Sequence, residues 1–129
     1  MRTLFLLLLG TTLHADDWPQ WLGPQRDGVW RETGIVEKFP EGGPKVLWRV
    51  KIGGGYTGPA IANGKVYLMD RQVAANTSVP GNAFARGIIP GTERVLCLDA
   101  ASGKQLWEHR YDCIYTMSYS TGPRCTPLV

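Results

Sequence analysis

The feature that most constrains the fold of this chain is the stretch Leu98–Trp107, where two apolar runs flank a short polar turn. The run Val95–Leu98 ends at Asp99, and apolar residues resume at Leu106 after a turn that contains Gly103. An Asp side chain accepts backbone N–H bonds inside such a turn, and glycine adopts a positive φ at little steric cost. The stretch therefore predicts a β-hairpin in which Asp99 caps the turn rather than acting as a catalytic carboxylate.

The composition favours an all-β protein around this hairpin. The 129 residues include 16 Gly and 9 Pro and are 43% hydrophobic, so the chain is rich in turn formers and can still bury a core. Short apolar runs separated by Gly and Pro are typical of all-β folds. Asn63-Gly64, between the runs Pro59–Ala62 and Lys65–Met69, predicts a second hairpin. Val46–Ile52 alternates apolar and polar residues, which predicts a half-exposed strand.

The spacing within the first hairpin resembles a known repeat, Ala-x-Asp-x-x-Thr-Gly-x-x-x-Trp. This is the tryptophan-docking motif of the pyrroloquinoline-quinone (PQQ) type β-propellers. Asp99, Gly103 and Trp107 match the motif in register. Ser102 stands for its Thr and Cys97 for its Ala. In that family the motif locks one blade to the next, so the resemblance implies architecture and no particular chemistry. It also implies that Trp107 is almost wholly buried, stacked over the peptide plane of a neighbouring hairpin.

The segment Asp17–Gly28 is similar to the Trp-Pro-rich opening of exported PQQ-like propeller proteins of environmental bacteria. Two interpretations of its tryptophans, Trp18 and Trp21, stand side by side. They could form a platform on which a sugar stacks, or they could cover the side or end of the propeller. We prefer the second interpretation.

The resemblance implies an all-β fold of the partial β-propeller, quinoprotein-like type, with about one four-stranded blade plus flanking strands. The blade strands are expected near Pro59, Val66, Val95 and Leu106, in order from the inside outward. Residues 71–92 are expected to be an insertion loop. Without that loop, the separation between the similar segments around Trp48 and Trp107 is close to one blade of about 40–50 residues.

The chain is therefore divided into three parts: residues 1–15 as a signal peptide, 16–45 as an irregular N-terminal segment, and 46–129 as incomplete propeller repeats. A propeller needs about four to eight blades to close. The sequence is accordingly expected to be an N-terminal fragment that lacks the remaining blades, with Val46–Ile52 as an outermost strand that closes the ring.

Residues 1–15 predict export to the periplasm or the extracellular space. Arg2 precedes the apolar run Leu4–Leu9, and small residues follow up to Ala15, which is the pattern of a secretory signal peptide. The run is too short to span a bilayer. The net charge of +3 without a basic run argues against a nucleic-acid partner.

The three cysteines, Cys97, Cys113 and Cys125, permit one disulfide and one free thiol without requiring either. Cys97 lies in an apolar run and is expected to be a small buried side chain. His14 and His109 complete no zinc pattern with these thiols. No metal ligand, cofactor-binding residue or catalytic residue is predicted in this chain.

Some charged residues have predicted positions. Arg71 and Arg86 are the charged residues of the 71–92 segment, and with no acidic neighbour in that segment they are the candidate contacts for an anion. Asp70, Glu93 and Arg94 are expected in turns or at exposed strand positions.

Three functions are weighed. The preferred one is a non-catalytic binding or assembly module whose partner is an unknown protein or small molecule. The first alternative is a PQQ-dependent quinoprotein dehydrogenase that oxidises alcohols or sugars, with PQQ and calcium bound only in the complete protein. The second is a scaffold similar to the propeller lipoprotein of the outer-membrane barrel-assembly machinery, although the chain has no cysteine near the expected cleavage site.

Overall fold

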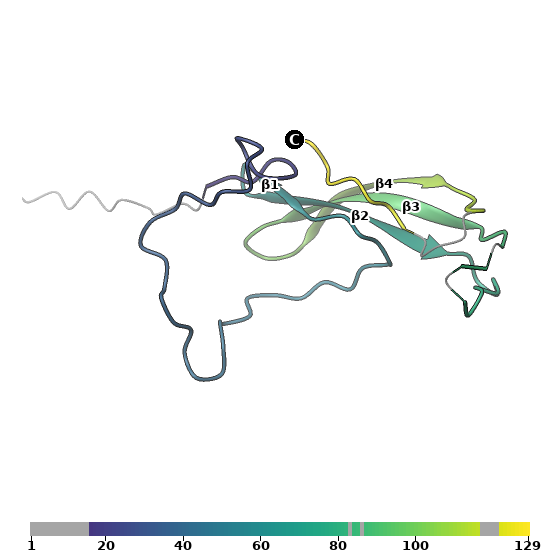
Figure 1. Ribbon diagram of the computed structural model, residues 1–129, viewed down its shortest axis with the longest axis horizontal. Helices are drawn as coiled ribbons and strands as arrows, with labels where there is room; N and C mark the ends of the chain where they lie inside the picture. The colour runs from purple at the N-terminus through teal and green to yellow at the C-terminus, as the bar shows by residue number, and fades with distance from the viewer. Residues whose placement is uncertain (1–15, 83, 86, 117–121) are drawn as a thin grey trace, which may run out of the picture.

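A single open antiparallel sheet organises the computed structural model of the chain, which describes residues 16–82, 84–85, 87–116 and 122–129 (Figure 1). Its strands are β1 (Ala60–Ala62), β2 (Lys65–Val73), β3 (Gly91–Asp99) and β4 (Gln105–Asp112), in the spatial order β1-β2-β3-β4. The described residues contain no helix. The all-β class and the four predicted strands are thus confirmed, and the predicted signal peptide lies outside the described residues.

The turn between β1 and β2 follows from local chemistry. Asn63 and Gly64 have φ values of 52° and 69° and join strands paired from Ala62 and Lys65 outward. Positive φ at both central residues is the geometry that matches the twist of the two strands in a tight hairpin. The hairpin predicted from Asn63-Gly64 is confirmed.

The predicted insertion loop is shorter than expected. β2 continues to Val73 and β3 begins at Gly91, and these two residues pair with each other. The first and last residues of the 71–92 segment therefore belong to the sheet. The residues at these ends are mostly polar, so the sequence pattern did not indicate strands there. Strand pairing uses backbone N–H and C=O groups and therefore tolerates polar side chains.

Successive side chains of a strand point to opposite faces, so the sheet has two faces of different composition. One face carries Val66, Leu96 and Leu98, which form the hydrophobic core cluster, and Trp48 packs against it. We call it the Trp48 face. The register places Tyr67, Cys97 and Trp107 together on the other face, which we call the Trp107 face.

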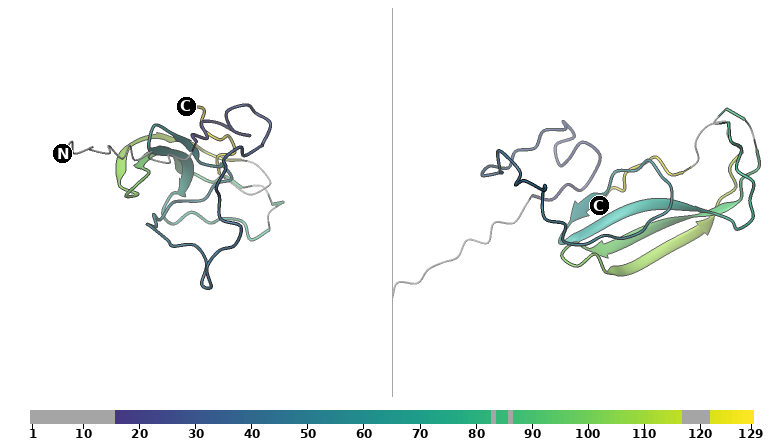
Figure 2. Two further views of the ribbon diagram at one scale, coloured as in Figure 1. Left: turned by 90° about the vertical axis from the view of Figure 1, so that its left-hand side faces the viewer. Right: turned by 90° about the horizontal axis from the view of Figure 1, so that it is seen from below.

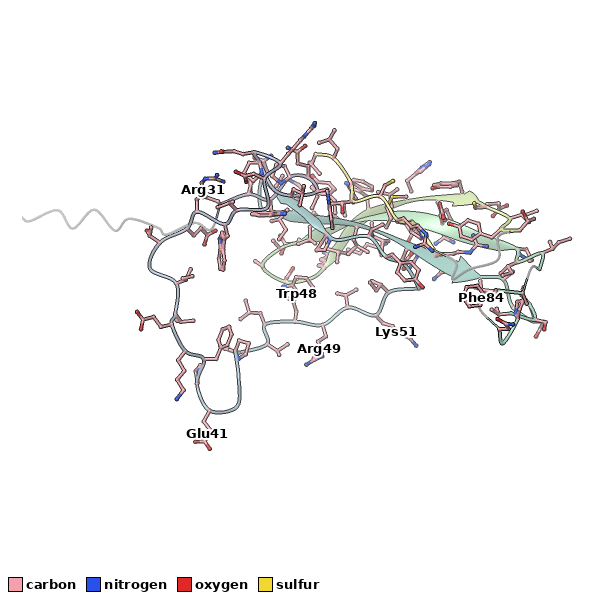
Figure 3. The ribbon with its side chains drawn as sticks, viewed as in Figure 1. Arg31, Glu41, Trp48, Arg49, Lys51 and Phe84 are labelled. Atoms are coloured by element: carbon pink, nitrogen blue, oxygen red, sulfur yellow. The ribbon has the colours of Figure 1, made fainter. Side chains whose placement is uncertain are left out.

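Val46–Ile52 does not form the predicted strand. The segment is part of a long excursion that leaves the sheet and returns to it (Figure 1). Figure 3 shows Trp48 pointing toward the sheet, whereas Arg49 and Lys51 point away from it. Alternation determines which side chains share a face, but a strand also needs a partner for its N–H and C=O groups. No described strand pairs with this segment.

A buried ion pair lies on the Trp48 face, where sequence reasoning expected exposed residues. Asp70 is 0% exposed and accepts hydrogen bonds from Arg94 Nε at 2.8 Å and Nη2 at 2.5 Å. Its Oδ2 atom also accepts a bond from the Gly53 N–H at 2.5 Å. The expectation of exposed positions was wrong because Asp70 and Arg94 are paired across β2 and β3 and the chain at Gly53 closes over them.

Burial alone would raise the pKa of Asp70, but the hydrogen bonds from Arg94 and Gly53 outweigh it and lower that pKa. The unfolded chain therefore binds a proton at Asp70 more readily than the folded chain does. The ion pair contributes its full stability above the ordinary Asp pKa of about 4. That contribution is lost as the pH falls through the lowered folded value.

We predict that Asp70→Asn in the natural full-length chain lowers the free energy of unfolding by about 3 kcal/mol. The substitution removes the carboxylate that is bonded to Arg94 Nε and Nη2, and it leaves Arg94 only the longer ion pair with Glu108 at 3.4 Å. Denaturant titration at pH 7 measures this loss, and the difference from the wild type should shrink below pH 4. The matched control is Asp27→Asn, whose pair with Arg31 is exposed and should matter little. Equal effects of the two substitutions would contradict the assignment.

Candidate functional site

The turn between β3 and β4 is built as the sequence predicts. Asp99 Oδ1 accepts hydrogen bonds from the backbone N–H of Ser102 at 2.8 Å and from its hydroxyl at 2.6 Å. The Gly103 N–H donates to the Asp99 carbonyl at 2.8 Å, and Gly103 has a φ of +71°. The bonds from Ser102 lower the pKa of Asp99. Asp99 is therefore a turn cap, as the sequence predicts, and Ser102 supplies both of the hydrogen bonds to its Oδ1.

Trp48 occupies the surface of this turn. Its indole Nε1–H donates to the carbonyl of Ala100 at 2.9 Å. A Cβ atom on Gly103 would lie 2.6 Å from Trp48 Cδ2, which is closer than any real contact. The turn therefore needs glycine for two reasons, its positive φ and the ring that lies against it. We call this arrangement the tryptophan-docking turn.

Sequence reasoning did not assign Trp48 to this contact. The available signal was the repeat itself, since Leu47-Trp48 and Leu106-Trp107 have the same local pattern. The motif instead predicted a docking role for Trp107, the tryptophan that follows the turn in sequence. The structure brings the other tryptophan to the turn.

Trp107 is 45% exposed, so the expectation of an almost wholly buried side chain is wrong for this structure. Its ring lies 6.1 Å from that of Tyr67 between centroids, at an interplanar angle of 55°. Trp107 pairs with Cys97 in the register of β3 and β4, whereas Trp48 packs against the core cluster of Val66, Leu96 and Leu98. The two tryptophans thus lie on opposite faces of the sheet.

Arg71 is not in a loop and is not accessible to an anion. It lies in β2, is 3% exposed, and donates from Nη1 to the Cys113 carbonyl at 2.8 Å and from Nη2 to the Ile89 carbonyl at 2.6 Å. Its guanidinium lies 3.9 Å from the ring centroid of Tyr115. Residues 89 and 115 form a bridge that covers this end of β2. Arg86, the other candidate, lies outside the described residues.

Glu93 is buried on the same face as Arg71. It is 7% exposed and accepts hydrogen bonds from the hydroxyls of Tyr111, at 2.5 Å, and Tyr115. The bond to the carboxylate raises the pKa of Tyr111 to about 12 because it favours the protonated phenol. Burial, together with the bond to Glu93, raises the pKa of Tyr115 to about 12. Both phenols therefore stay protonated at neutral pH and hold the carboxylate in place.

The three thiols are free in the structure. Cys97 is fully buried in β3, as its apolar run predicts. Cys113 is half-buried and Cys125 is exposed. Within the ranges that the structure describes, no three side chains of the His, Cys, Asp and Glu types come together as a metal site would require.

No protein-family model, curated protein or solved structure matches this chain. In the described part of the chain, no helix has the length and apolar character needed to cross a membrane.

We predict that Gly103→Ala destabilises the fold by more than Gly64→Ala does. Both glycines have similar positive φ values, +71° and +69°, so both substitutions cost about 1–2 kcal/mol of backbone strain. Only at Gly103 does the new methyl group also displace an indole, because nothing lies within 4 Å of a Cβ at Gly64.

Denaturant titration of the two variants in the natural full-length chain isolates the contribution of Trp48. The emission of Trp48 should also shift to the red in Gly103→Ala and stay unchanged in Gly64→Ala. Equal destabilisation, with no change of emission, would show that Trp48 is not docked on the turn.

Proposed function

We propose that this chain is part of an exported PQQ-like β-propeller that acts as a non-catalytic binding or assembly module. The four-stranded sheet would be one blade of that propeller. The observation that carries the proposal is the indole of Trp48 docked on the Asp99–Gly103 turn, with its N–H bonded to Ala100. In the propellers that the sequence resembles, this contact joins neighbouring blades.

The two faces of the sheet support the proposal. A blade in a propeller has one neighbour on each side, so each of its faces needs a docking contact. On the Trp48 face a tryptophan from outside the sheet reaches the turn of this sheet. On the Trp107 face the sheet presents a half-exposed tryptophan of its own. Trp107 would dock on the turn of the next blade as Trp48 docks on this one.

The segment Val46–Ile52 forms no strand in the structure, and in this proposal it would gain strand partners only from the blade on the Trp48 side. Trp48 of this segment is held by the docking turn, whereas Leu47 is 73% and Val46 56% exposed. An apolar, extended segment with no strand beside it has unpaired backbone groups and an uncovered surface. Strands of the blade to which it belongs would cover both.

The placement of the charged groups favours the non-catalytic function over the dehydrogenase. Asp70 and Arg94 bind each other, Glu93 binds two tyrosines, and Arg71 binds two carbonyls. These charged groups of the sheet already bind partners within the fold, so they are not free to bind a cofactor or a metal ion. Export and any use of PQQ and calcium belong to the complete protein in this proposal.

We predict that Trp107→Ala in the natural full-length chain lowers the free energy of unfolding by about 3–5 kcal/mol, because the indole, half-exposed on this sheet, would be buried by the next blade. The physical reason is docking of its indole on a neighbouring turn. The matched control is Trp30→Ala, because Trp30 is 59% exposed and belongs to no docking motif. A loss below about 1 kcal/mol for Trp107→Ala, measured by denaturant titration, would sink the docking proposal.

The non-catalytic part of the proposal has its own test, calorimetric titration of PQQ with calcium into the natural full-length chain. We expect no binding in the micromolar range, because a site for three carboxylates and a calcium ion needs convergent cations and about 6–8 oxygen ligands. Micromolar binding of PQQ, together with dye-linked alcohol oxidation, would contradict the non-catalytic function and support the dehydrogenase function.

A further inference from the structure

A surface hollow of about 270 Å³ lies beside the N-terminal turns, and none of the predicted functions uses it. Its walls come from residues 20–26 and 126–128, far apart in sequence. These two parts of the chain lie side by side near β1 in every view (Figure 2), and the Val129 N–H donates to the Pro19 carbonyl at 3.0 Å. The lining residues are Gln20, Trp21, Leu22, Arg26, Thr126 and Leu128.

The structure separates the roles of the two neighbouring tryptophans. Trp18 is structural, because its backbone pairs with Ile61 at 2.8 and 2.9 Å and its ring lies where a Cβ on Gly23 would stand. Trp18 therefore packs within the N-terminal turns. Trp21, in contrast, is 67% exposed and lines the hollow. An exposed indole at the edge of a hollow is a flat apolar surface open to a ligand.

The backbone of the hollow is unusual. Leu22 and Arg26 have φ values of 65° and 58°, although neither is glycine. Non-glycine residues in this region are strained and concentrate at sites that hold ligands. Bonds from Gly23 to Gln20 and from Arg26 to Gly23, each of 3.1 Å, hold the turns in place. Leu22 and Arg26 both line the hollow, so these hydrogen-bonded turns define the shape of its wall.

The charge of the hollow is positive. Arg26 is its one charged lining residue. The guanidinium is oriented by a bond of 2.8 Å from Arg26 Nε to Gln20 Oε1. Its two terminal nitrogens have no hydrogen-bond partner among the described residues, so they can bind a carboxylate through two parallel bonds. The adjacent carboxylate, Asp27, is engaged by Arg31 at 2.5 Å.

We propose that this hollow binds one pyranose ring that carries a carboxylate, as in an acidic polysaccharide. The apolar C–H face of the ring would stack on the indole of Trp21, and the carboxylate would bind Arg26. The side chains of Gln20 and Thr126 would take hydroxyl groups. The hollow, at about 270 Å³, is smaller than the about 300–1,000 Å³ of sites for drug-sized ligands, which favours a ligand as small as one sugar ring. This site is independent of the docking turn, so the proposal holds or fails separately from the propeller proposal.

The test is calorimetric titration of the natural full-length chain with glucuronate, glucose and a galacturonate trimer. We expect glucuronate to bind at least about tenfold more tightly than glucose, because only the acid makes the charge-assisted pair with Arg26. Tighter binding of the trimer would identify the ligand as part of a polysaccharide, and equal binding would identify it as the free acid. Equal affinity for glucose and glucuronate, or no binding of any of the three, overturns the proposal.

Two variants and one control assign the contacts. Trp21→Ala should abolish binding of all three ligands. Arg26→Gln should make the affinities for glucuronate and glucose about equal, with weak binding of glucose retained. Trp30→Ala is the control, since Trp30 is comparably exposed at 59% and lines a different hollow. Thermal melts establish that each variant is folded. Unchanged glucuronate affinity in a folded Trp21→Ala variant contradicts the proposed stacking.

Discussion

The contact between the indole of Trp48 and the Asp99–Gly103 turn attaches the irregular part of the chain to its sheet. The bond from Trp48 to Ala100 joins residues 52 apart, and it anchors the segment around Trp48, which pairs with no strand. The entropy lost on closing a loop grows slowly with its length, so one well-made contact can hold a long excursion. The contact is specific as well as apolar, because the indole of Trp48 lies so close to Gly103 that no side chain would fit there.

The segment anchored by Trp48 then covers the buried ion pair. The same chain that places Trp48 on the core cluster continues to Gly53, whose N–H completes the bonds to Asp70. A buried carboxylate is tolerated only when it is paired and hydrogen-bonded. The docking turn and the ion pair are therefore two attachments of one segment. Together these two attachments hold the segment against the Trp48 face.

Local turn chemistry allowed much of the fold to be predicted from the sequence. Asn63-Gly64 and the Asp99–Gly103 turn each specify their own geometry, and the strands follow from the apolar runs between them. The contacts of Trp48 depend on which distant segment covers a face, and alternation of residue types carries no such information. The 45% exposure of Trp107 likewise depends on which segments cover that face of the folded sheet.

The candidate sites were less predictable for a related reason. Arg71 has a polar sequence neighbourhood, which suggested a loop, but its cover comes from residues near Ile89 and Tyr115 that are close only in the folded chain. The hollow beside Trp21 also joins segments from opposite ends of the described chain. Sequence showed an aromatic pair there, and only the fold separates Trp18, which is packed, from Trp21, which is exposed.

Four charged residues, two in β2 and two in β3, also help to fix the register of these strands. In the observed register Asp70 faces Arg94 and Arg71 faces Glu93. A slip of one residue in one direction would place two carboxylates opposite each other, and a slip in the other direction would place two guanidiniums opposite each other. Either slip would also turn the apolar side chains to the wrong face. The pairing of these two strands is therefore protected against misalignment in both directions.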